Sequence, residues 1–386
     1  MIFGERAARI SVFVAELGAE GAVAEELLRY NQSEFVHDEH TRALRFPLAD
    51  EPFVAAWERY LAEAAHAGVF PTLQRKLVQL AFPISQGVST TEAYLAATRR
   101  GVWPAAAPES GLQLVAPEAL EMQIYATPAG RLPILITRER ADFETLLRAL
   151  TKRNEPAAVP LSQGACMVAG YNNWDRIADL RRQWESGALA DGSSSWDECF
   201  VRLQPRKELY QDRFILLSDG GYSGVTASSL GLDEPAWRGI SLAIRRDHEC
   251  THYFTKRVFQ SMRNLLLDEV IADFMGLRTA AKGYRADWFL RFMGLEGFPS
   301  YREGGRLQNY LGAPPLSTEA FRLVCLVVKR ASEQLEIFDR NLPGDVESSA
   351  VLMALTGSSL LEFAMPEAPN MLAKSVKDFY GRRPTS

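Results

Sequence analysis

The stretch EPAWRGISLAIRRDHECTHYFTKRVFQSMRNLLLDEVIADFMGLRTA, residues 234–280, decides how the second half of this chain folds. Glu234 and Pro235 place an acidic residue and a proline where a helix is expected to begin. Apolar residues then recur at steps of three or four, which predicts a long helix at 235–259. A second helix is predicted at 264–281, and it is apolar around most of its circumference, so we expect it to be buried.

The first helix carries the pattern H-E-x-x-H in His248-Glu249-Cys250-Thr251-His252. Residues four apart lie on one face of a helix, so the two imidazoles can occupy two corners of a tetrahedral zinc site. Glu249 then points at the open metal position, where it can act as a general base, whereas Cys250 points away and is interpreted as a packing residue. The alternative is a pair of core histidines that hydrogen-bond to protein groups. The chain has only five histidines, which makes a chance match uncommon.

The second helix offers a third metal ligand. Glu269 and Asp273 are four apart and share a face, close to the small residues Ala272 and Gly276, which let two helices approach closely. Glu269 can complete the zinc shell, and Asp273 can accept the free ring N–H of a ligating histidine and fix its tautomer. The alternative, a solvated acidic face, is opposed by the apolar neighbours of both residues.

These two helices resemble the gluzincin metallopeptidases, especially the thermolysin-like group, over about residues 235–280. In that family H-E-x-x-H is followed by a helix with a motif close to N-E-x-x-S-D, and DEVIAD at 268–273 matches it with Asp for Asn and Ala for Ser. The resemblance implies zinc as cofactor, with the following residues in the site: the ligands His248, His252 and Glu269, the general base Glu249 and the histidine partner Asp273. The whole chain also loosely resembles a bacterial protein family that is itself uncharacterised.

Two features depart from the gluzincin pattern. Sixteen residues separate His252 from Glu269, fewer than in most gluzincins, so we expect a tight turn around 260–263. No histidine follows His252, although thermolysin-like enzymes use a downstream histidine and a tyrosine to stabilise the oxyanion. The polar, glycine-rich segment 300–306 offers donors that could replace them, unless it is a surface loop with paired charges. The candidates are Tyr301, Arg302 and Arg306.

The rest of the chain predicts an α+β fold with a helical domain at 1–105, an α+β region at 106–230 and a helical domain at 231–386. The middle region should hold a small, mostly antiparallel sheet, with a hairpin turn at 128–130. Strands are predicted at 112–115, 122–126, 132–136, 165–169, 200–203 and 214–217. Further helices are predicted at 142–153, 174–184, 317–339, 345–356 and 368–380. The strand at 214–217 is either an ordinary hairpin strand or an edge strand that pairs with an extended substrate.

Composition excludes several classes of function. The net charge of −5 gives no reason to expect nucleic acid or an anionic membrane as partner. The four cysteines lack paired spacing, which favours a reducing compartment without disulfides. There is no secretory signal at the N-terminus and no apolar run of membrane-spanning length, so we expect a soluble, cytoplasmic protein. His37 and His40 are interpreted as loop or helix-edge residues rather than a second metal site.

The sequence therefore predicts a zinc-dependent hydrolase, first of all a metallopeptidase that acts on a peptide or small amide substrate. One alternative is a zinc hydrolase of a small non-peptide amide or ester. Another is a non-catalytic protein that keeps zinc as a structural or sensing site. Glu249 opposes that last alternative, because a structural site has no need of a general base.

Overall fold

The computed structural model describes residues 2–33, 35–104, 111–189, 192–261 and 265–381. The chain divides into two compact units. The discontinuous unit comprises Met1–Leu48 and Gly221–Ser386, and the inserted unit comprises Ala49–Gly220. The helical region expected at 1–105 is thus shared between the two units.

The inserted unit is built on a four-stranded sheet with the order β1-β2-β4-β3. Its strands are β1 Glu121–Thr127, β2 Gly130–Thr137, β3 Ala165–Asn172 and β4 Gln211–Ser218. β1 runs antiparallel to β2, and β3 runs antiparallel to β4, whereas β2 and β4 are parallel. The predicted α+β class with a small, mostly antiparallel sheet is therefore confirmed.

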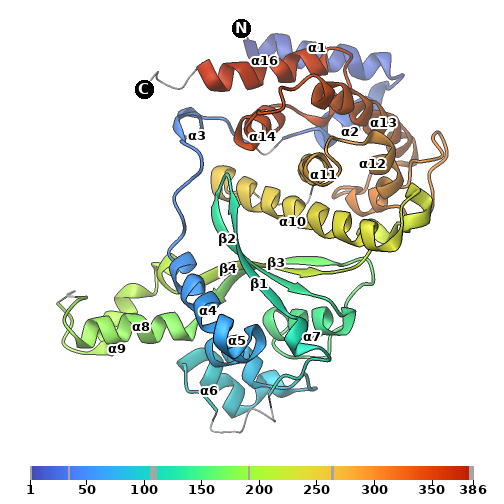
Figure 1. Ribbon diagram of the computed structural model, residues 1–386. Coiled ribbons are helices and arrows are strands. Elements are labelled where there is room, and N and C mark those ends of the chain that lie inside the picture. The colour runs from blue at the N-terminus through green and yellow to red at the C-terminus, as the bar shows by residue number, and fades with distance from the viewer. Residues whose placement is uncertain (1, 34, 105–110, 190–191, 262–264, 382–386) are drawn as a thin grey trace. The chain divides into compact units, whose positions relative to one another are not determined.

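Helices α4 and α7 pack against this sheet (Figure 1). Trp57 of α4 places its ring 4.7 Å from the ring of Phe214 in β4 and donates a hydrogen bond to the buried Asp212. The α-helices of the unit are α4 Phe53–Ala67, α5 Val69–Lys76, α6 Glu92–Arg100, α7 Arg140–Thr151, α8 Trp174–Glu185 and α9 Trp196–Leu203. Its short 3-10 helices are η1 Val78–Ala81, η2 Val88–Thr90, η4 Pro117–Ala119 and η5 Lys207–Leu209.

Two expectations about the strands are wrong. Residues 112–115 form no strand, and 200–203 belong to α9. Ser195 caps α9 by accepting from the backbone N–H of Glu198, so the short apolar run continues a helix. The predicted strand at 214–217 lies within β4, between β2 and β3, which excludes the alternative of an edge strand that pairs with a substrate.

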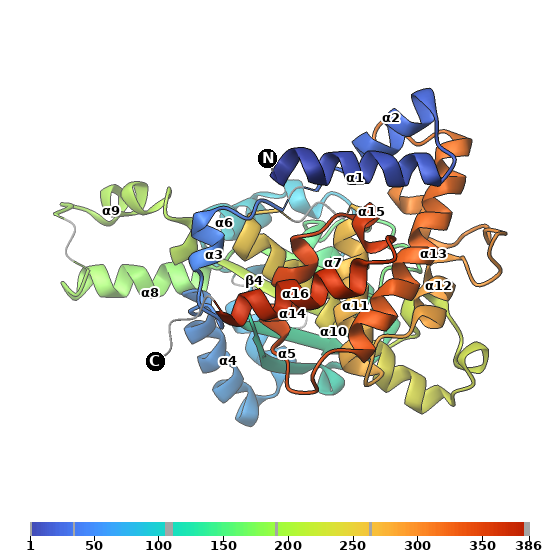
Figure 2. The same cartoon turned by 90° about the horizontal axis from the view of Figure 1, so that it is seen from above.

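The discontinuous unit is helical. Its α-helices are α1 Ile2–Glu16, α2 Gly21–Tyr30, α3 Glu39–Ala43, α10 Glu234–Phe259, α11 Leu266–Ala280, α12 Ala286–Met293, α13 Thr318–Arg340, α14 Ser348–Thr356, α15 Leu360–Phe363 and α16 Ala368–Gly381. Its 3-10 helices are η6 Tyr222–Gly224, η7 Ala227–Leu230 and η8 Arg306–Tyr310. α11 packs across α10, and α16 packs against both α13 and α14 (Figures 1 and 2). The predicted helices of this half are confirmed, and α12 and α15 are additions.

The two chain segments of the discontinuous unit are joined by specific contacts. The guanidinium of Arg6 in α1 pairs with Glu362 of α15, and the hydroxyl of Tyr30 donates to the backbone oxygen of Tyr310. No helix among the described residues combines the length and the apolar character that crossing a membrane requires. Cys166, Cys199, Cys250 and Cys325, all among the described residues, form no disulfide bond.

Candidate metal centre

α10 and α11 hold the predicted metal ligands, and both their ends and their contact follow from the sequence. α10 begins where the side chain of Asp233 accepts a hydrogen bond from the N–H of Ala236 at 2.7 Å. It ends at Gln260, whose φ of 57° lies in the left-handed region. The turn expected around 260–263 thus begins as predicted, and residues 262–264 lie outside the described residues.

The two helices approach each other at a glycine. A Cβ on Gly276 of α11 would lie 2.7 Å from the backbone oxygen of Ile244 in α10, closer than a carbon atom can approach. A side chain here would therefore push the helices apart. The expectation that small residues permit a close helix pair is met at Gly276.

The structure brings His248, His252 and Glu269 together as a group that could hold a metal ion. The Nε2 atoms of the two histidines are 3.1 Å apart. The Glu269 carboxylate oxygens lie 3.6 Å from Nε2 of His248 and 3.5 Å from Nε2 of His252. Ligand atoms about 2.0–2.1 Å from a tetrahedral zinc ion are about 3.3 Å apart, so these separations suit a shared ion.

The remaining ring nitrogens each face an aspartate. Nδ1 of His248 lies 2.9 Å from Oδ1 of Asp273, in hydrogen-bond geometry. Nδ1 of His252 lies 3.2 Å from Oδ2 of Asp268, in an ion-pair contact whose geometry falls short of a hydrogen bond. A carboxylate beside Nδ1 favours the proton there and leaves the Nε2 lone pair free for a metal.

The close approach of these donor atoms to one another suits a cation between them. Two Nε2 lone pairs and a carboxylate converge on one small volume, where they repel one another unless a proton or a metal ion lies between them. Burial lowers the pKa of His252, but Asp268 and Glu269 beside it outweigh burial and raise that pKa well above its usual value. A cation is therefore favoured at this point, and the residues present fit a divalent metal.

Asp273 is held by two further groups from outside the helix pair. The hydroxyl of Tyr222 in η6 donates to Oδ1 of Asp273 at 2.6 Å and lies 3.1 Å from Nδ1 of His248. Nη2 of Arg306 donates to Oδ2 of Asp273 at 2.5 Å, while Nη1 donates to the hydroxyls of Tyr222 and Ser223. Burial raises the pKa of Asp273, but Arg306 and His248 outweigh it, so the pKa is lowered and the carboxylate stays charged.

Glu269 also has partners from η8. The hydroxyl of Tyr310 donates to Oε2 of Glu269 at 2.9 Å, and Nη2 of Arg306 lies 3.5 Å from the same oxygen. The preceding loop is fixed by a crossing of two glycines, because a Cβ on Gly294 would lie 2.7 Å from Cα of Gly305. This crossing sets where η8 begins, and so where Arg306 enters the site.

The other predicted site residues lie in different surroundings. Glu249 is partly exposed on α10, and its carboxylate forms no hydrogen bond or ion pair within the part of the chain that the structure describes. The side chains of Tyr301 and Arg302 contact residues of their own loop and its surroundings, and not the metal group. The hydroxyl of Tyr301 donates to the backbone oxygen of Gly305, and the exposed guanidinium of Arg302 pairs with Glu296.

Sequence reasoning missed three residues of this centre. Asp268 had a usable signal, because it is a second carboxylate next to Glu269 in an otherwise apolar helix. Tyr222 and Tyr310 had none, because each lies in a short 3-10 helix far from the motif along the chain. Of the donors considered in the 300–306 segment, the structure brings Arg306 into the centre.

Comparison with known proteins adds a family but no activity. No curated protein and no solved structure matches the chain. The gluzincin resemblance is therefore not supported by any relative and rests on the two helical motifs alone. A family model described as a family of unknown function (DUF7005) matches residues 12–367, which include parts of both units and the whole metal centre. The chain belongs to this family of unknown function.

Proposed function

We propose that this protein is a zinc-dependent hydrolase, and first of all a metallopeptidase that cleaves a peptide or amide bond. The observation that carries the proposal is the convergence of His248, His252 and Glu269 on one point. Two histidines and one glutamate are a donor set used by catalytic zinc sites, which leave a fourth position for water or substrate. The free carboxylate of Glu249, next to the first ligand, supplies the second element that hydrolysis needs.

The reaction would use the chain's own groups as follows. His248, His252 and Glu269 would hold the zinc ion, which would supply a water of lowered pKa, about 7, and a Lewis acid for the substrate carbonyl. Glu249 accepts the proton of the attacking water and then delivers it to the leaving amine. Its partial exposure and lack of a partner leave it free for both transfers. Asp273 and Asp268 keep the two imidazoles oriented throughout.

Arg306 is the group best suited to stabilise the developing oxyanion. Its two terminal nitrogens are engaged by Asp273, Glu269, Tyr222 and Ser223, which fix the side chain. Its Nε–H has no hydrogen-bond partner among the described residues, so this donor is unused. Because the nitrogen is buried, substrate binding would have to open the centre before this donor could reach an oxyanion.

The test is the Glu249→Gln variant, after a mixed peptide library and then chromogenic esters and amides have been screened for a substrate. The amide keeps the shape of the side chain but cannot accept a proton as a carboxylate does. We expect normal zinc content and a turnover lowered by about 10²–10⁴-fold. Glu234→Gln, on the exposed first turn of the same helix, is the matched control and should retain full turnover. Cleavage that chelation stops and Glu249→Gln leaves intact would contradict the mechanism.

A second candidate is a non-catalytic zinc protein, and burial of the ligands favours it. His248, His252 and Glu269 are only 7%, 4% and 6% exposed, as in a structural site. This candidate predicts no cleavage of any library member and a fourth protein ligand closing the coordination sphere, visible by X-ray absorption spectroscopy. If only the chromogenic esters or small amides are cleaved, the protein is a zinc hydrolase of small molecules instead.

A further inference from the structure

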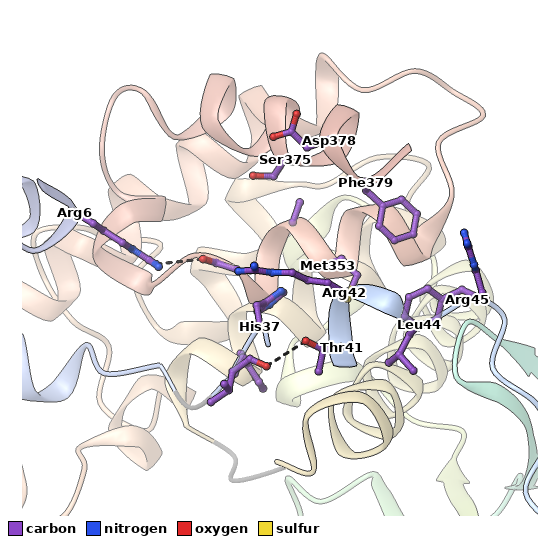
Figure 3. Close-up of a pocket in the computed structure, with 15 residues that line it drawn as sticks. Arg6, His37, Thr41, Arg42, Leu44, Arg45, Met353, Ser375, Asp378 and Phe379 are labelled. Carbon is purple, nitrogen blue, oxygen red and sulfur yellow. Dashed lines mark hydrogen bonds between the residues drawn. The ribbon is translucent and has the colours of Figure 1, made fainter. Parts of the chain in front are cut away.

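A cavity of about 420 Å³ lies in the discontinuous unit, and none of the three proposed metal ligands lines it. α3 and the segment after it contribute one side, and α14 and α16 contribute the other (Figure 3). Its volume falls within the range of small-molecule sites, about 300–1,000 Å³, near the lower end. The cavity therefore suits a compact ligand rather than a chain segment.

The cavity has an excess of positive charge. Three arginines line it together with His37, namely Arg6, Arg42 and Arg45. Asp378 contributes the one negatively charged carboxylate of the lining. In Figure 3 Arg6 and Arg45 lie at opposite ends of the cavity, with Arg42 between them. Such an excess is local, because the whole chain carries a net charge of −5.

Two of these arginines have hydrogen-bonding capacity to spare. Arg6 is engaged, because its guanidinium pairs with Glu362 and donates to the backbone oxygen of Gly357. The guanidinium groups of Arg42 and Arg45, both exposed, form no hydrogen bond or ion pair with any residue in the described ranges. A planar guanidinium matches phosphate or carboxylate oxygens in a two-point contact, which an exposed lysine cannot reproduce.

The same cavity has an aromatic wall. Phe46 and Phe379 line it, with their ring centroids 6.2 Å apart. Phe46 is itself supported from behind by Phe254 of α10, at 5.4 Å. Rings held in this way present a fixed apolar surface on which a flat organic group can pack.

We propose that this cavity binds a small organic anion. Arg42 and Arg45 would hold its phosphate or carboxylate group, and Phe46 and Phe379 would pack against its flat apolar body. This inference does not depend on the proposed hydrolase activity, because the two sites share no residue. It assigns to the chain a ligand site separate from the metal centre.

The experiment is isothermal titration calorimetry with three probes: phenyl phosphate, benzoate and inorganic phosphate. We expect saturable binding of phenyl phosphate or benzoate, tighter than that of inorganic phosphate because only the former two reach the aromatic wall. The stronger of the two organic probes identifies the anionic group. The double variant Arg42→Gln/Arg45→Gln should lose at least about tenfold in affinity for the organic probe. Arg238→Gln, an exposed arginine on α10 outside the cavity, should bind like the wild type.

Two further variants distinguish binding in this cavity from binding at the metal centre. Phe379→Leu should bring the affinity for the organic probe down towards that for inorganic phosphate while leaving inorganic phosphate unchanged. Because anions also ligate metal ions, each titration is repeated with His252→Ala, which should bind the probes as the wild type does. Wild-type protein that binds none of the probes, or equal affinity in the double-arginine variant, overturns the proposal. Binding that disappears only in His252→Ala also overturns it, because the anion then occupies the metal centre.

Discussion

Gly276 of α11 sits against the backbone oxygen of Ile244 in α10, with no room for a Cβ between them. Ile244 lies one helical turn before His248, and Gly276 lies one helical turn after Asp273, so this contact closes the helix pair directly beside the metal group. The spacing of the two helices therefore depends on residue 276 being glycine, which has only a hydrogen atom in place of a side chain. The distance from Glu269 to the histidines depends on the same spacing.

Gly276→Ala should accordingly destabilise the protein. The added methyl group must push against backbone, and overpacking of this kind costs about 1–3 kcal/mol. Urea unfolding should show a lower midpoint with an unchanged slope. Gly239→Ala on α10 is the matched control, because a Cβ there meets nothing within 4 Å and should stabilise the helix slightly. Equal midpoints for Gly276→Ala and the wild type would show that the helices can separate without cost.

Zinc content tests the ligand set directly. The purified wild type should contain about one zinc per chain, and His252→Ala should contain little or none, because two protein ligands hold zinc poorly. Elemental analysis after gel filtration measures both. His66→Ala, a histidine of the inserted unit, serves as the control and should keep its zinc. Equal zinc in His252→Ala and the wild type would remove these residues from the site.

The two aspartates should tune metal affinity without being ligands. Asp273→Ala should weaken zinc binding by about 10–100-fold, because His248 loses the carboxylate that orients its ring. Asp268→Ala should act in the same direction through His252, and by less, because that contact lacks hydrogen-bond geometry. Competition with a chromogenic chelator measures both affinities. An unchanged affinity in Asp273→Ala is the result that would exclude this role.

Arg306→Gln should destabilise the metal-free protein more than the metal-bound protein. Without the guanidinium, the buried carboxylates of Asp273 and Glu269 lose their cation, and breaking such a pair costs about 3–5 kcal/mol. A bound divalent ion restores part of the compensation. Thermal unfolding with and without zinc should therefore show a larger zinc-induced shift in Tm for the variant. Arg302→Gln, four residues earlier and exposed, should change Tm by little in either state.

The ion pair between Arg6 and Glu362 should give the stability of the discontinuous unit a dependence on pH. Burial raises the pKa of Glu362, but Arg6 and the backbone at Ser359 outweigh burial and lower it below the usual 4.5. Because the folded-state pKa is lowered, the contribution is complete above the unfolded-state pKa and is lost as the pH falls through the folded-state value. Arg6→Gln should therefore be less stable than the wild type at pH 7 by urea unfolding, and the difference should shrink at pH 3. A difference that is the same at both pH values would contradict the pairing.

The residues of the candidate metal centre that lie on α10 and α11, and the fold class, could be predicted because they depend on short-range periodicity. H-E-x-x-H, Glu269 and Asp273 are each fixed by spacing within one helix, and the buried helices and the sheet follow from their apolar patterns. The strand expected at 200–203 failed because a run of four residues, three of them apolar, cannot distinguish a strand from the end of a helix, and the cap at Ser195 decided for the helix. The length of the segment and its N-terminal cap, rather than its hydrophobicity, distinguish the helix from a strand here.

The groups that reach the centre from outside α10 and α11 could not be predicted because their positions depend on tertiary packing. Arg306 and Tyr310 reach Glu269 only because the chain folds back where Gly294 and Gly305 cross. No local pattern distinguishes Arg306 from Arg302, its neighbour in the same polar segment, yet one enters the site and the other pairs on the surface. The division into units was hidden for the same reason, since residues 1–48 complete a unit whose remainder begins at 221.

That discontinuity has a consequence for how the chain is made. During synthesis residues 1–48 leave the ribosome before the rest of their unit, so Arg6 and Tyr30 find their partners Glu362 and Tyr310 only after the inserted unit and most of the helical segment have emerged. The apolar faces of α1 and α2 remain uncovered in the meantime, whereas the contacts of the compact unit Ala49–Gly220 lie mostly within one continuous segment. At about 5–20 residues per second this wait lasts on the order of 20–60 s, long enough for a chaperone to bind the nascent N-terminal helices.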